Sequence, residues 1–225
     1  MTINKEIARL HFITIDHPAV SHADQAIRAY KAGCKWVQLR MKDRSPDEIE
    51  KEVRKILPVA RAYDAVLLIN DHTEMVLRTG AHGVHLGQND MSPIEAREIL
   101  GPEYIIGGTA NTLEDVICLI ENGVDYVGLG PYRFTTTKKK LSPTLGKDGY
   151  TQILTELNRL DLKMPIIAIG GILDNDIESL MHTGIYGIAA AGAIMAGNDI
   201  ETNIQKYKLL IYPENETFNN SRQGV

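Results

Sequence analysis

Four segments of the chain repeat one pattern, in which a helical stretch ends in glycine and a short apolar strand follows at a fixed distance. The segments read AGCKWVQLR, TGAHGVHLG, NGVDYVGLG and TGIYGIAAA, and their glycines are Gly33, Gly80, Gly123 and Gly184. Glycine is favoured at the left-handed position that ends a helix. We therefore expect four helices that end at these glycines, each followed at once by a strand.

Four further strand candidates lie between these copies, at residues 10–16, 66–71, 104–110 and 165–171. Strand and helix then alternate eight times, and 225 residues is close to the usual size of one closed barrel. We predict a single-domain α/β fold, a (β/α)8 TIM barrel over residues 1–212, with a flexible polar tail at 213–225. A doubly wound open sheet is the alternative, but no glycine-rich fingerprint follows the first strand.

Serine followed by proline occurs at Ser45 and at Ser92, a combination typical of a helix N-cap with proline in the first helical position. Asp174 or Asn175 is a candidate N-cap for the helix before Gly184.

Side chains alternate between the two faces of a strand, so residues two apart share a face. The residues five and seven positions after each repeat glycine are polar or very small, whereas their neighbours are apolar. We expect the polar and small set to face the barrel interior, and it comprises Gln38, Arg40, His85, Gly87, Gly128, Gly130, Ala189 and Ala191.

Composition excludes few classes. The net charge is −5, which gives no general electrostatic case for nucleic acid. No stretch is apolar and long enough to span a membrane, and the N-terminus has no signal-peptide pattern, so we expect a cytoplasmic protein. Cys34 and Cys118 lie alone in apolar contexts and are expected to be buried, reduced thiols.

Active sites of such barrels lie at the carboxyl ends of the strands. Asp71 and Asp90 stand at two adjacent strand ends, and carboxylate oxygens suit Mg²⁺. The same residues could simply cap the next helix or turn. Arg40, Lys42 and Lys138 near the same rim favour the metal, because acidic and basic groups around one mouth suit a metal-bound diphosphate.

Two further features favour phosphate binding. The segment 135–140 holds three threonines and three lysines, which can surround a phosphate or can form an ordinary solvated loop. Gly170 and Gly171 after strand seven and Gly192 after strand eight occupy the usual phosphate position of this barrel. His85 faces inward, as a substrate contact or as a satisfied interior residue. His11, His17, His22 and His182 have no partner that the sequence identifies.

Five strand ends together resemble the thiamine-phosphate synthase family. They read VQLRMK (37–42), IND (69–71), GVHLGQND (83–90), GPYRFTTTKK (130–139) and AIGGI (168–172). The resemblance extends over residues 10–197. It implies an Mg²⁺-dependent transferase that couples 4-amino-5-hydroxymethyl-2-methylpyrimidine diphosphate with thiazole phosphate, and releases diphosphate by a dissociative route. The implied partners are therefore small phosphorylated molecules, and a homo-oligomer stays open.

The resemblance also assigns residues to roles. It implies that Asp71 and Asp90 bind the metal, and that Thr109, Lys138 and Arg40 are catalytic. The implied pyrimidine diphosphate site comprises Gln38, Leu39, Arg40, Met41, Lys42, Asn70, Thr109 and Lys138. The implied thiazole phosphate site comprises Thr135, Thr136, Thr137, Gly170, Gly171, Ala191 and Gly192.

The sequence departs from the family at five positions. Thr109 stands where serine is usual, Ala110 and Asn111 where threonine and histidine are frequent, Gly192 where serine is common, and His72 where arginine is frequent. A thiazole tautomerase-like relative, which has a functional histidine near strand five, is one alternative function. A phosphate-binding barrel without catalysis is another. Retention of both aspartates with Lys42 and Lys138 favours the synthase.

Overall fold

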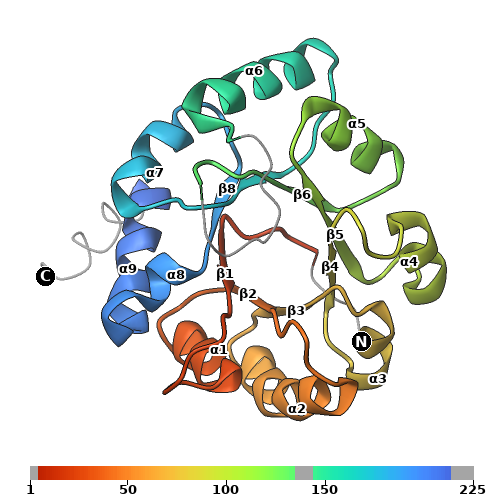
Figure 1. Cartoon of the computed structure of the whole chain (residues 1–225), viewed down its shortest axis with the longest axis vertical. Coiled ribbons are helices and arrows are strands. Elements are labelled where there is room, and N and C mark those ends of the chain that lie inside the picture. The colour runs from red at the N-terminus through yellow and green to blue at the C-terminus, as the bar shows by residue number, and fades with distance from the viewer. Residues whose placement is uncertain (1–4, 135–143, 214–225) are drawn as a thin grey trace, which may run out of the picture.

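The computed structural model describes residues 5–134 and 144–213, and these form one closed barrel of parallel strands in chain order, surrounded by helices (Figure 1). The predicted (β/α)8 barrel is confirmed. The strands are β1 (Leu10–Ile13), β2 (Trp36–Leu39), β3 (Val66–Asn70), β4 (Gly83–Leu86), β5 (Ile105–Ala110), β6 (Tyr126–Leu129), β7 (Ile166–Ala168) and β8 (Gly187–Ala190).

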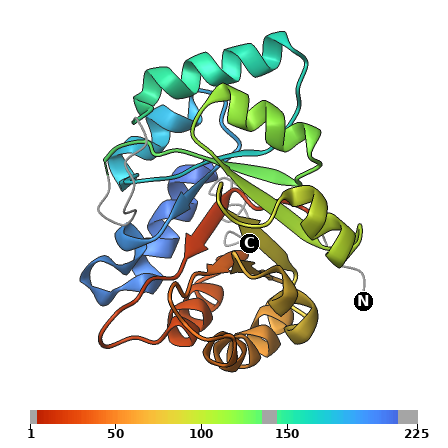
Figure 2. The ribbon, with the colours of Figure 1, turned by 45° about the vertical axis from the view of Figure 1, so that its right-hand side comes forward.

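The helices form an outer ring around the strands, which is seen obliquely in Figure 2. In the described residues they are α1 (His22–Lys31), α2 (Pro46–Ala62), α3 (Thr73–Thr79), α4 (Pro93–Leu100), α5 (Leu113–Glu121), α6 (Gly146–Arg159), α7 (Asp174–Met181), α8 (Gly192–Met195) and α9 (Ile200–Ile211), with a short 3₁₀ turn at Ala196–Asn198.

The glycine and serine–proline signals read from the sequence account for six helix boundaries. Gly33, Gly80, Gly123 and Gly184 have φ of 85°, 73°, 73° and 88°, the left-handed conformation that glycine adopts without steric cost. Ser45 and Ser92 each form a capping box with the glutamate three residues later, and proline follows in the first turn. These predictions are confirmed.

Two expectations are wrong. Helix α7 already begins at Asp174, so neither Asp174 nor Asn175 is its N-cap; Leu173 precedes the helix, and its N–H donates to the Asp176 carboxylate at 2.8 Å. Cys118 is exposed on α5, because α5 turns this side chain away from the barrel, whereas Cys34 is buried as expected.

The predicted alternation of faces produces two separate apolar layers. Val37, Leu39 and Val84 lie in the layer between strands and helices. Trp36, Leu68 and Tyr126 lie in the layer inside the barrel. A one-residue change of register would exchange the two sets, so the pattern fixes which side chains reach the interior.

An aromatic cluster lies in the barrel interior at the amino ends of the strands. The His11 ring stacks on Trp36 with centroids 4.5 Å apart, and Tyr126 meets both rings edge-on. A Cβ at Gly107 would lie 2.2 Å from the Tyr126 ring, so only glycine leaves room for it. Burial lowers the pKa of His11 to about 3, and its Nε2 is 2.8 Å from the Ala8 carbonyl oxygen.

Two of the predicted regions fall outside the described residues. Most of the tail predicted at 213–225 does so, and the whole of segment 135–140 does so. Among the described helices, none has both the length and the apolar character required to cross a membrane.

Candidate active site

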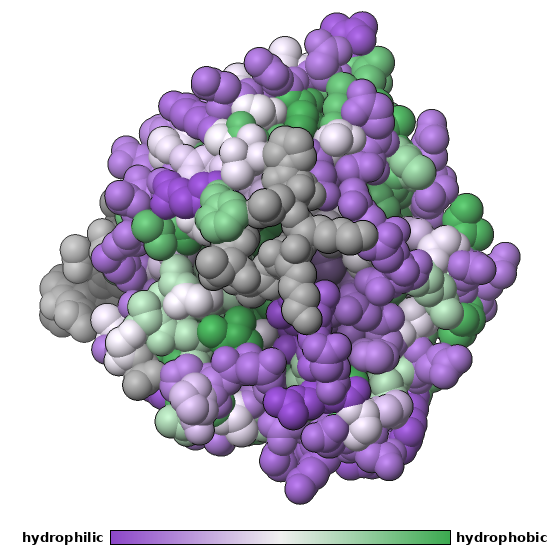
Figure 3. Space-filling model, in the orientation of Figure 1, coloured by the Kyte–Doolittle hydropathy of each residue, from purple (hydrophilic) through white to green (hydrophobic). Residues whose placement is uncertain are grey.

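The candidate active site lies where the chain leaves the carboxyl ends of the strands. All eight strand pairings are parallel, so these ends share one side of the barrel, which we call the mouth. Around β2 and β3 and over α2, in the lower half of the view in Figure 3, the surface is mainly hydrophilic.

Gln38 and Asn70 form a buried amide pair in the barrel interior. The Gln38 Nε2 donates to Asn70 Oδ1 at 2.7 Å, and the side chains are 4% and 9% exposed. Each amide still has groups to share, since one contact uses one donor and one acceptor. The pair can therefore present hydrogen-bonding groups of fixed orientation to a ring bound above it.

Asp71 and Asp90 meet at the ends of β3 and β4. Burial of Asp71, together with the hydrogen bond and charge of Asp90, raises the pKa of Asp71 to about 7, against the opposing effect of Lys42 and Arg40. Asp71 also has φ of 68°, an uncommon conformation outside glycine that often accompanies functional sites. The two carboxylates are thus held together despite their repulsion.

Gly87 holds the Asp90 side chain in this position. Its N–H donates to Asp90 Oδ2 at 2.7 Å, and a Cβ at Gly87 would lie only 2.7 Å from the same oxygen. Two converging carboxylates, with mutual repulsion that a cation would remove, fit a divalent ion with oxygen ligands. Mg²⁺ commonly takes one or two carboxylates and completes its shell with water and substrate phosphate, so this donor set suits it.

Arg40 and Lys42 follow β2 on the same side of the mouth. Arg40 is half-buried and interacts electrostatically with Asp71, Asp16 and Asp43; burial nevertheless lowers its pKa. Lys42 is exposed. Leu39 and Met41 direct their side chains into the outer apolar layer, which leaves only their backbone for a ligand at the mouth.

Thr109 at the end of β5 belongs to a chain of three hydrogen-bonded side chains. Its Oγ1 is 2.9 Å from His85 Nε2, and His85 Nδ1 is 2.8 Å from the Tyr126 hydroxyl. A Cβ at Gly128 would come within 3.1 Å of the His85 ring, so glycine at this position leaves space for the imidazole. The inward direction predicted for His85 is correct, and its ring orients the Thr109 hydroxyl.

On the opposite side, Gly170 and Gly171 follow β7 with φ of 98° and 71°. The segment after β6 packs across them: Tyr132 and Arg133 donate their N–H groups to the carbonyls of Ile169 and Gly170 at 2.9 and 3.0 Å. A Cβ at Gly171 would lie 2.4 Å from Arg133 Cγ. These two loops therefore approach as closely as they do only because Gly171 has no side chain.

Ala191 links β8 to α8, and Gly192 is the first residue of α8. Gly192 is exposed and begins the four-residue helix, and a Cβ there would meet nothing within 4 Å. The remaining predicted residues of this side, Thr135, Thr136, Thr137 and Lys138, lie outside the described residues.

The departures at Asn111 and His72 have structural consequences. Asn111 donates through Nδ2 to the Gly130 carbonyl, and its N–H donates to Asp115 at 2.8 Å. Its amide thus joins the ends of β5 and β6. His72 is exposed and precedes α3 without a side-chain capping bond.

The comparisons with known proteins agree with this geometry. The family model described as thiamine monophosphate synthase matches residues 10–194. The chain belongs to the thiamine monophosphate synthase family.

Relatives of the chain in this family match most of its length. The thiamine-phosphate synthase of Phocaeicola vulgatus is 50% identical over 190 residues, which are 84% of this chain and 91% of the relative. That of Bacteroides fragilis is 48% identical over 190 residues, 84% of this chain and 93% of the relative. The solved thiamine phosphate pyrophosphorylase of Pyrococcus furiosus superposes with a TM-score of 0.81 at 27% identity, covering 91% of this chain and 96% of that structure.

Sequence reasoning missed two groups of residues at this site. Tyr126 lies two residues before Gly128 on the inward face of β6, so the alternation already applied to Gly128 could have identified it. Thr14, Asp16 and His22 surround the end of β1, where the chain has no repeat and no periodicity to reveal the contact.

Proposed function

We propose that this protein is an Mg²⁺-dependent thiamine-phosphate synthase. It joins 4-amino-5-hydroxymethyl-2-methylpyrimidine diphosphate to thiazole phosphate and releases diphosphate. The observation that carries the metal-dependent part is the convergence of Asp71 and Asp90 beside Arg40 and Lys42. Family membership and the high coverage of the synthase relatives support the coupling reaction.

The bond changes define what the residues must do. The C–O bond between the pyrimidine methylene and the diphosphate breaks, and its electron pair leaves with the diphosphate oxygen. The thiazole nitrogen supplies the pair for the new C–N bond, so no oxidant or reductant takes part. Negative charge grows on the leaving group and positive charge on the methylene, and the main requirement is preorganised charge around the diphosphate.

Residues on the β2–β4 side meet that requirement. Asp71 and Asp90 would hold Mg²⁺, which when bound neutralises charge on the leaving diphosphate. Arg40 and Lys42 add positive charge on the same side, and Lys138 is proposed as a third contributor. The amide pair Gln38–Asn70 orients the pyrimidine ring.

Thr109 is placed to act near the pyrimidine. His85 and Tyr126 fix its hydroxyl from below, so it keeps the hydrogen-bonding group that the family's usual serine would supply. The backbone of Leu39 and Met41 completes this half.

The thiazole phosphate is assigned to the other side of the mouth. In this assignment the backbone N–H groups of Gly170, Gly171, Ala191 and Gly192 bind the anion, because backbone N–H groups at such turns bind phosphate well. Thr135, Thr136 and Thr137 are proposed to add hydroxyl donors.

The test is a coupling assay with purified protein. Thiamine phosphate and diphosphate should appear together when both substrates and Mg²⁺ are present, and chelation of the metal should stop both. Omission of thiazole phosphate is the matched control. Absence of thiamine phosphate under every condition would contradict the proposal, and conversion of the thiazole tautomer without coupling would assign the chain to the tautomerase-like relatives instead.

A further inference from the structure

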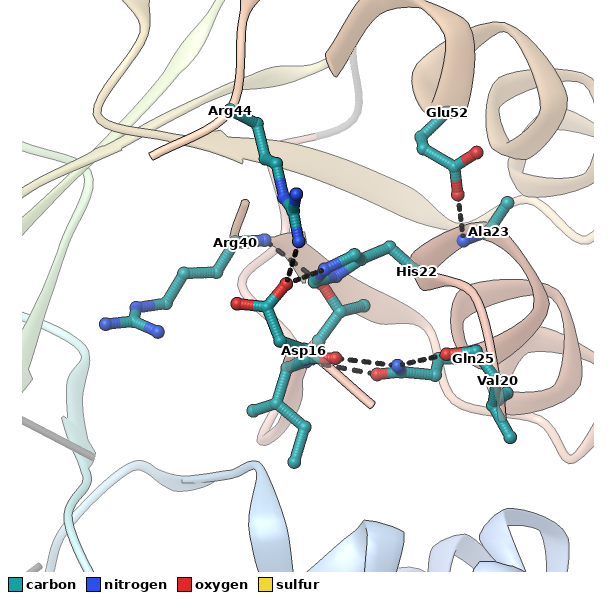
Figure 4. Close-up of polar contacts among 10 residues, drawn as sticks. Asp16, Val20, His22, Ala23, Gln25, Arg40, Arg44 and Glu52 are labelled. Carbon is teal, nitrogen blue, oxygen red and sulfur yellow. Dashed lines mark hydrogen bonds and ion pairs between the residues drawn. The ribbon is translucent and has the colours of Figure 1, made fainter. Parts of the chain in front are cut away.

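A chain of polar contacts connects the end of β1 to the backbone of Arg40 (Figure 4). Thr14 follows β1, and its N–H donates to the Gln38 carbonyl at 3.0 Å, as in the sheet. The next contact differs, because the Arg40 N–H donates to the Thr14 hydroxyl oxygen at 3.0 Å. The ladder between β1 and β2 therefore ends on a side chain, and that side chain is 0% exposed.

The direction of these hydrogen bonds follows from the chemistry of the partners wherever one partner can only donate or only accept. His22 Nδ1 is 2.8 Å from Thr14 Oγ1, and His22 Nε2 is 3.3 Å from Asp16 Oδ1. A carboxylate only accepts, so His22 Nε2 donates to Asp16, whereas either Thr14 Oγ1 or His22 Nδ1 can donate in the other contact. In both cases the Thr14 oxygen accepts the Arg40 N–H, because a backbone N–H only donates.

Asp16 is kept ionised by its surroundings. Partial burial acts to raise its pKa, but the hydrogen bonds and charges of Arg44 and His22 outweigh it, so the pKa is lowered. Arg44 reaches Asp16 at 3.2 Å from the loop after β2. The carboxylate is thus bound from α1 on one side and from the loop after Arg40 on the other.

The Gln25 side chain fixes the backbone that follows Thr14. Gln25 is 0% exposed; it accepts the Ile15 N–H at 3.0 Å and donates to the carbonyls of Ile15 and Val20 at 2.7 and 3.0 Å. Thr14 therefore projects from a backbone that is fixed on both sides of it.

Carboxylate, imidazole and hydroxyl in this order also occur in enzymes that activate a nucleophile. That role does not fit here. The Thr14 oxygen is inaccessible and already accepts the Arg40 N–H, so no substrate atom can reach it. The hydroxyl instead holds the backbone of Arg40, the residue that the proposed function places beside the diphosphate.

We propose that Thr14, with His22 and Asp16 behind it, is a positioning residue that fixes Arg40 for the diphosphate of the substrate. In Figure 4 the Arg40 side chain runs away from His22 and Asp16. The guanidinium interacts electrostatically with Asp71, which is the direction of the candidate metal site. This role rests on the proposed function, because it acts on the leaving-group side of that reaction.

The test compares Thr14→Val with Thr14→Ser. Valine keeps the shape but removes the hydroxyl, so the Arg40 N–H and His22 Nδ1 both lose a partner, whereas serine keeps both bonds. Since small misplacements of a catalytic group can cost on the order of 100-fold in rate, we expect kcat/KM to fall about 10- to 100-fold in Thr14→Val. The KM for the pyrimidine diphosphate should rise, the KM for thiazole phosphate should stay unchanged, and Thr14→Ser should restore activity.

A double-mutant cycle tests whether the effect passes through Arg40. In an Arg40→Ala background, Thr14→Val should cause little further loss, because the group that it positions is gone. Glu52→Ala is the matched control: it removes the 2.8 Å bond to the Ala23 N–H at the same end of α1 but has no link to Arg40. His22→Phe should lie between wild type and Thr14→Val, because Thr14 keeps its bond to Arg40.

Wild-type kinetics in Thr14→Val, or an equal loss with and without Arg40, would overturn the positioning role. Calorimetric titration with inorganic diphosphate and Mg²⁺ gives a readout that needs no coupling, and Thr14→Val should bind about tenfold more weakly. If wild type binds diphosphate but forms no thiamine phosphate, the proposed function fails while a weakened Thr14→Val still supports the role. Equal diphosphate binding by wild type and Thr14→Val would contradict the positioning role of Thr14.

Discussion

The two halves of the mouth present different parts of the chain. The half at β2, β3 and β4 presents charged and amide side chains, among them Asp71, Asp90 and Gln38. The half at β7 and β8 presents glycine backbone, with Gly170 and Gly171 in left-handed conformations. Substitutions that remove side-chain groups should disable the β2–β4 half. Substitutions that add a side chain to glycine should disable the β7–β8 half.

The reason for the difference lies in the interior below. Under β2–β6, polar and aromatic side chains such as His85 and Tyr126 fill the barrel and support the groups above them. Under β7 and β8 the interior side chains are Ile167 and Ala189, which offer no polar support. In the proposed function, anion recognition there depends on main-chain groups, which need no side chain to orient them.

The largest effect is expected for Asp71→Asn. The change keeps the shape but removes one negative charge of the candidate metal site, and loss of one preorganised electrostatic group typically costs on the order of 100- to 1000-fold in kcat. Coupling should fall by that amount, and more Mg²⁺ should be needed for half-maximal rate. The measurement is initial rate against Mg²⁺ concentration.

Asp43→Asn is the matched control for this prediction. Asp43 is exposed, follows the same side of the mouth and also has positive φ, 59°. It should change the rate less than about twofold, since an exposed charge is screened by water and salt. Equal losses in the two variants would show that general rim charge, and no specific metal site, is involved.

A second prediction concerns the buried layer below the side-chain half. The pKa of His11 in the folded protein, about 3, is below its unfolded value of 6.5. Between these two pH values His11 is therefore protonated in the unfolded chain and neutral in the folded protein. Stability should therefore fall as pH drops from 6.5 toward 3, by at most about 1.4 kcal/mol per pH unit from this residue. Above pH 6.5 His11 contributes no pH dependence.

His11→Phe keeps a ring against Trp36 but has no titrating group. Urea unfolding of the two proteins at pH 7.5, 6 and 5 isolates the difference, since all other groups are common to both. The gap in unfolding free energy should change in favour of the variant as pH falls. Parallel pH curves would show that folding leaves the pKa of His11 unchanged.

The barrel could be predicted from the sequence because the repeat shows two local signals: a glycine that ends each helix, and an alternation of side chains in the strand that follows. Gly33, Gly80 and Gly123 mark helix ends, and the alternation after them separates inner from outer side chains. The strand-end rule then selected Asp71 and Asp90, which the fold brings together. Local rules of this kind depend on backbone geometry and are visible residue by residue.

The remaining features depend on contacts that no local rule encodes. His22 meets Thr14 across a loop, and no period links residues eight apart in such a segment. Cys118 was misplaced because an apolar sequence context does not fix the face of α5 on which it lies. These contacts are decided by how α1 and α5 pack on the barrel, which only the three-dimensional structure reveals.

On the backbone half, Gly171→Ala should have the largest effect. A left-handed conformation costs a residue with a Cβ about 1–2 kcal/mol, and the new atom would lie 2.4 Å from Arg133 Cγ. We expect the KM for thiazole phosphate to rise roughly tenfold, as 1.4 kcal/mol corresponds to a factor of ten, while the KM for the pyrimidine diphosphate changes little. A rise in the KM for the pyrimidine diphosphate alone would contradict this assignment and place Gly171 in the other half of the mouth.

The smallest effect is expected for Gly192→Ala, which makes the same chemical change in the same half. No atom lies within 4 Å of the position of the new Cβ, and Gly192 is not among the glycines with positive φ. Alanine also favours the helix that begins here, by up to about 1 kcal/mol relative to glycine in a helix interior. The backbone N–H stays available, so the KM for thiazole phosphate should change less than about twofold. A large loss in Gly192→Ala, measured beside Gly171→Ala, would mean that the ligand itself occupies the space next to Gly192, and the backbone half would then discriminate by shape as well as by hydrogen bonding.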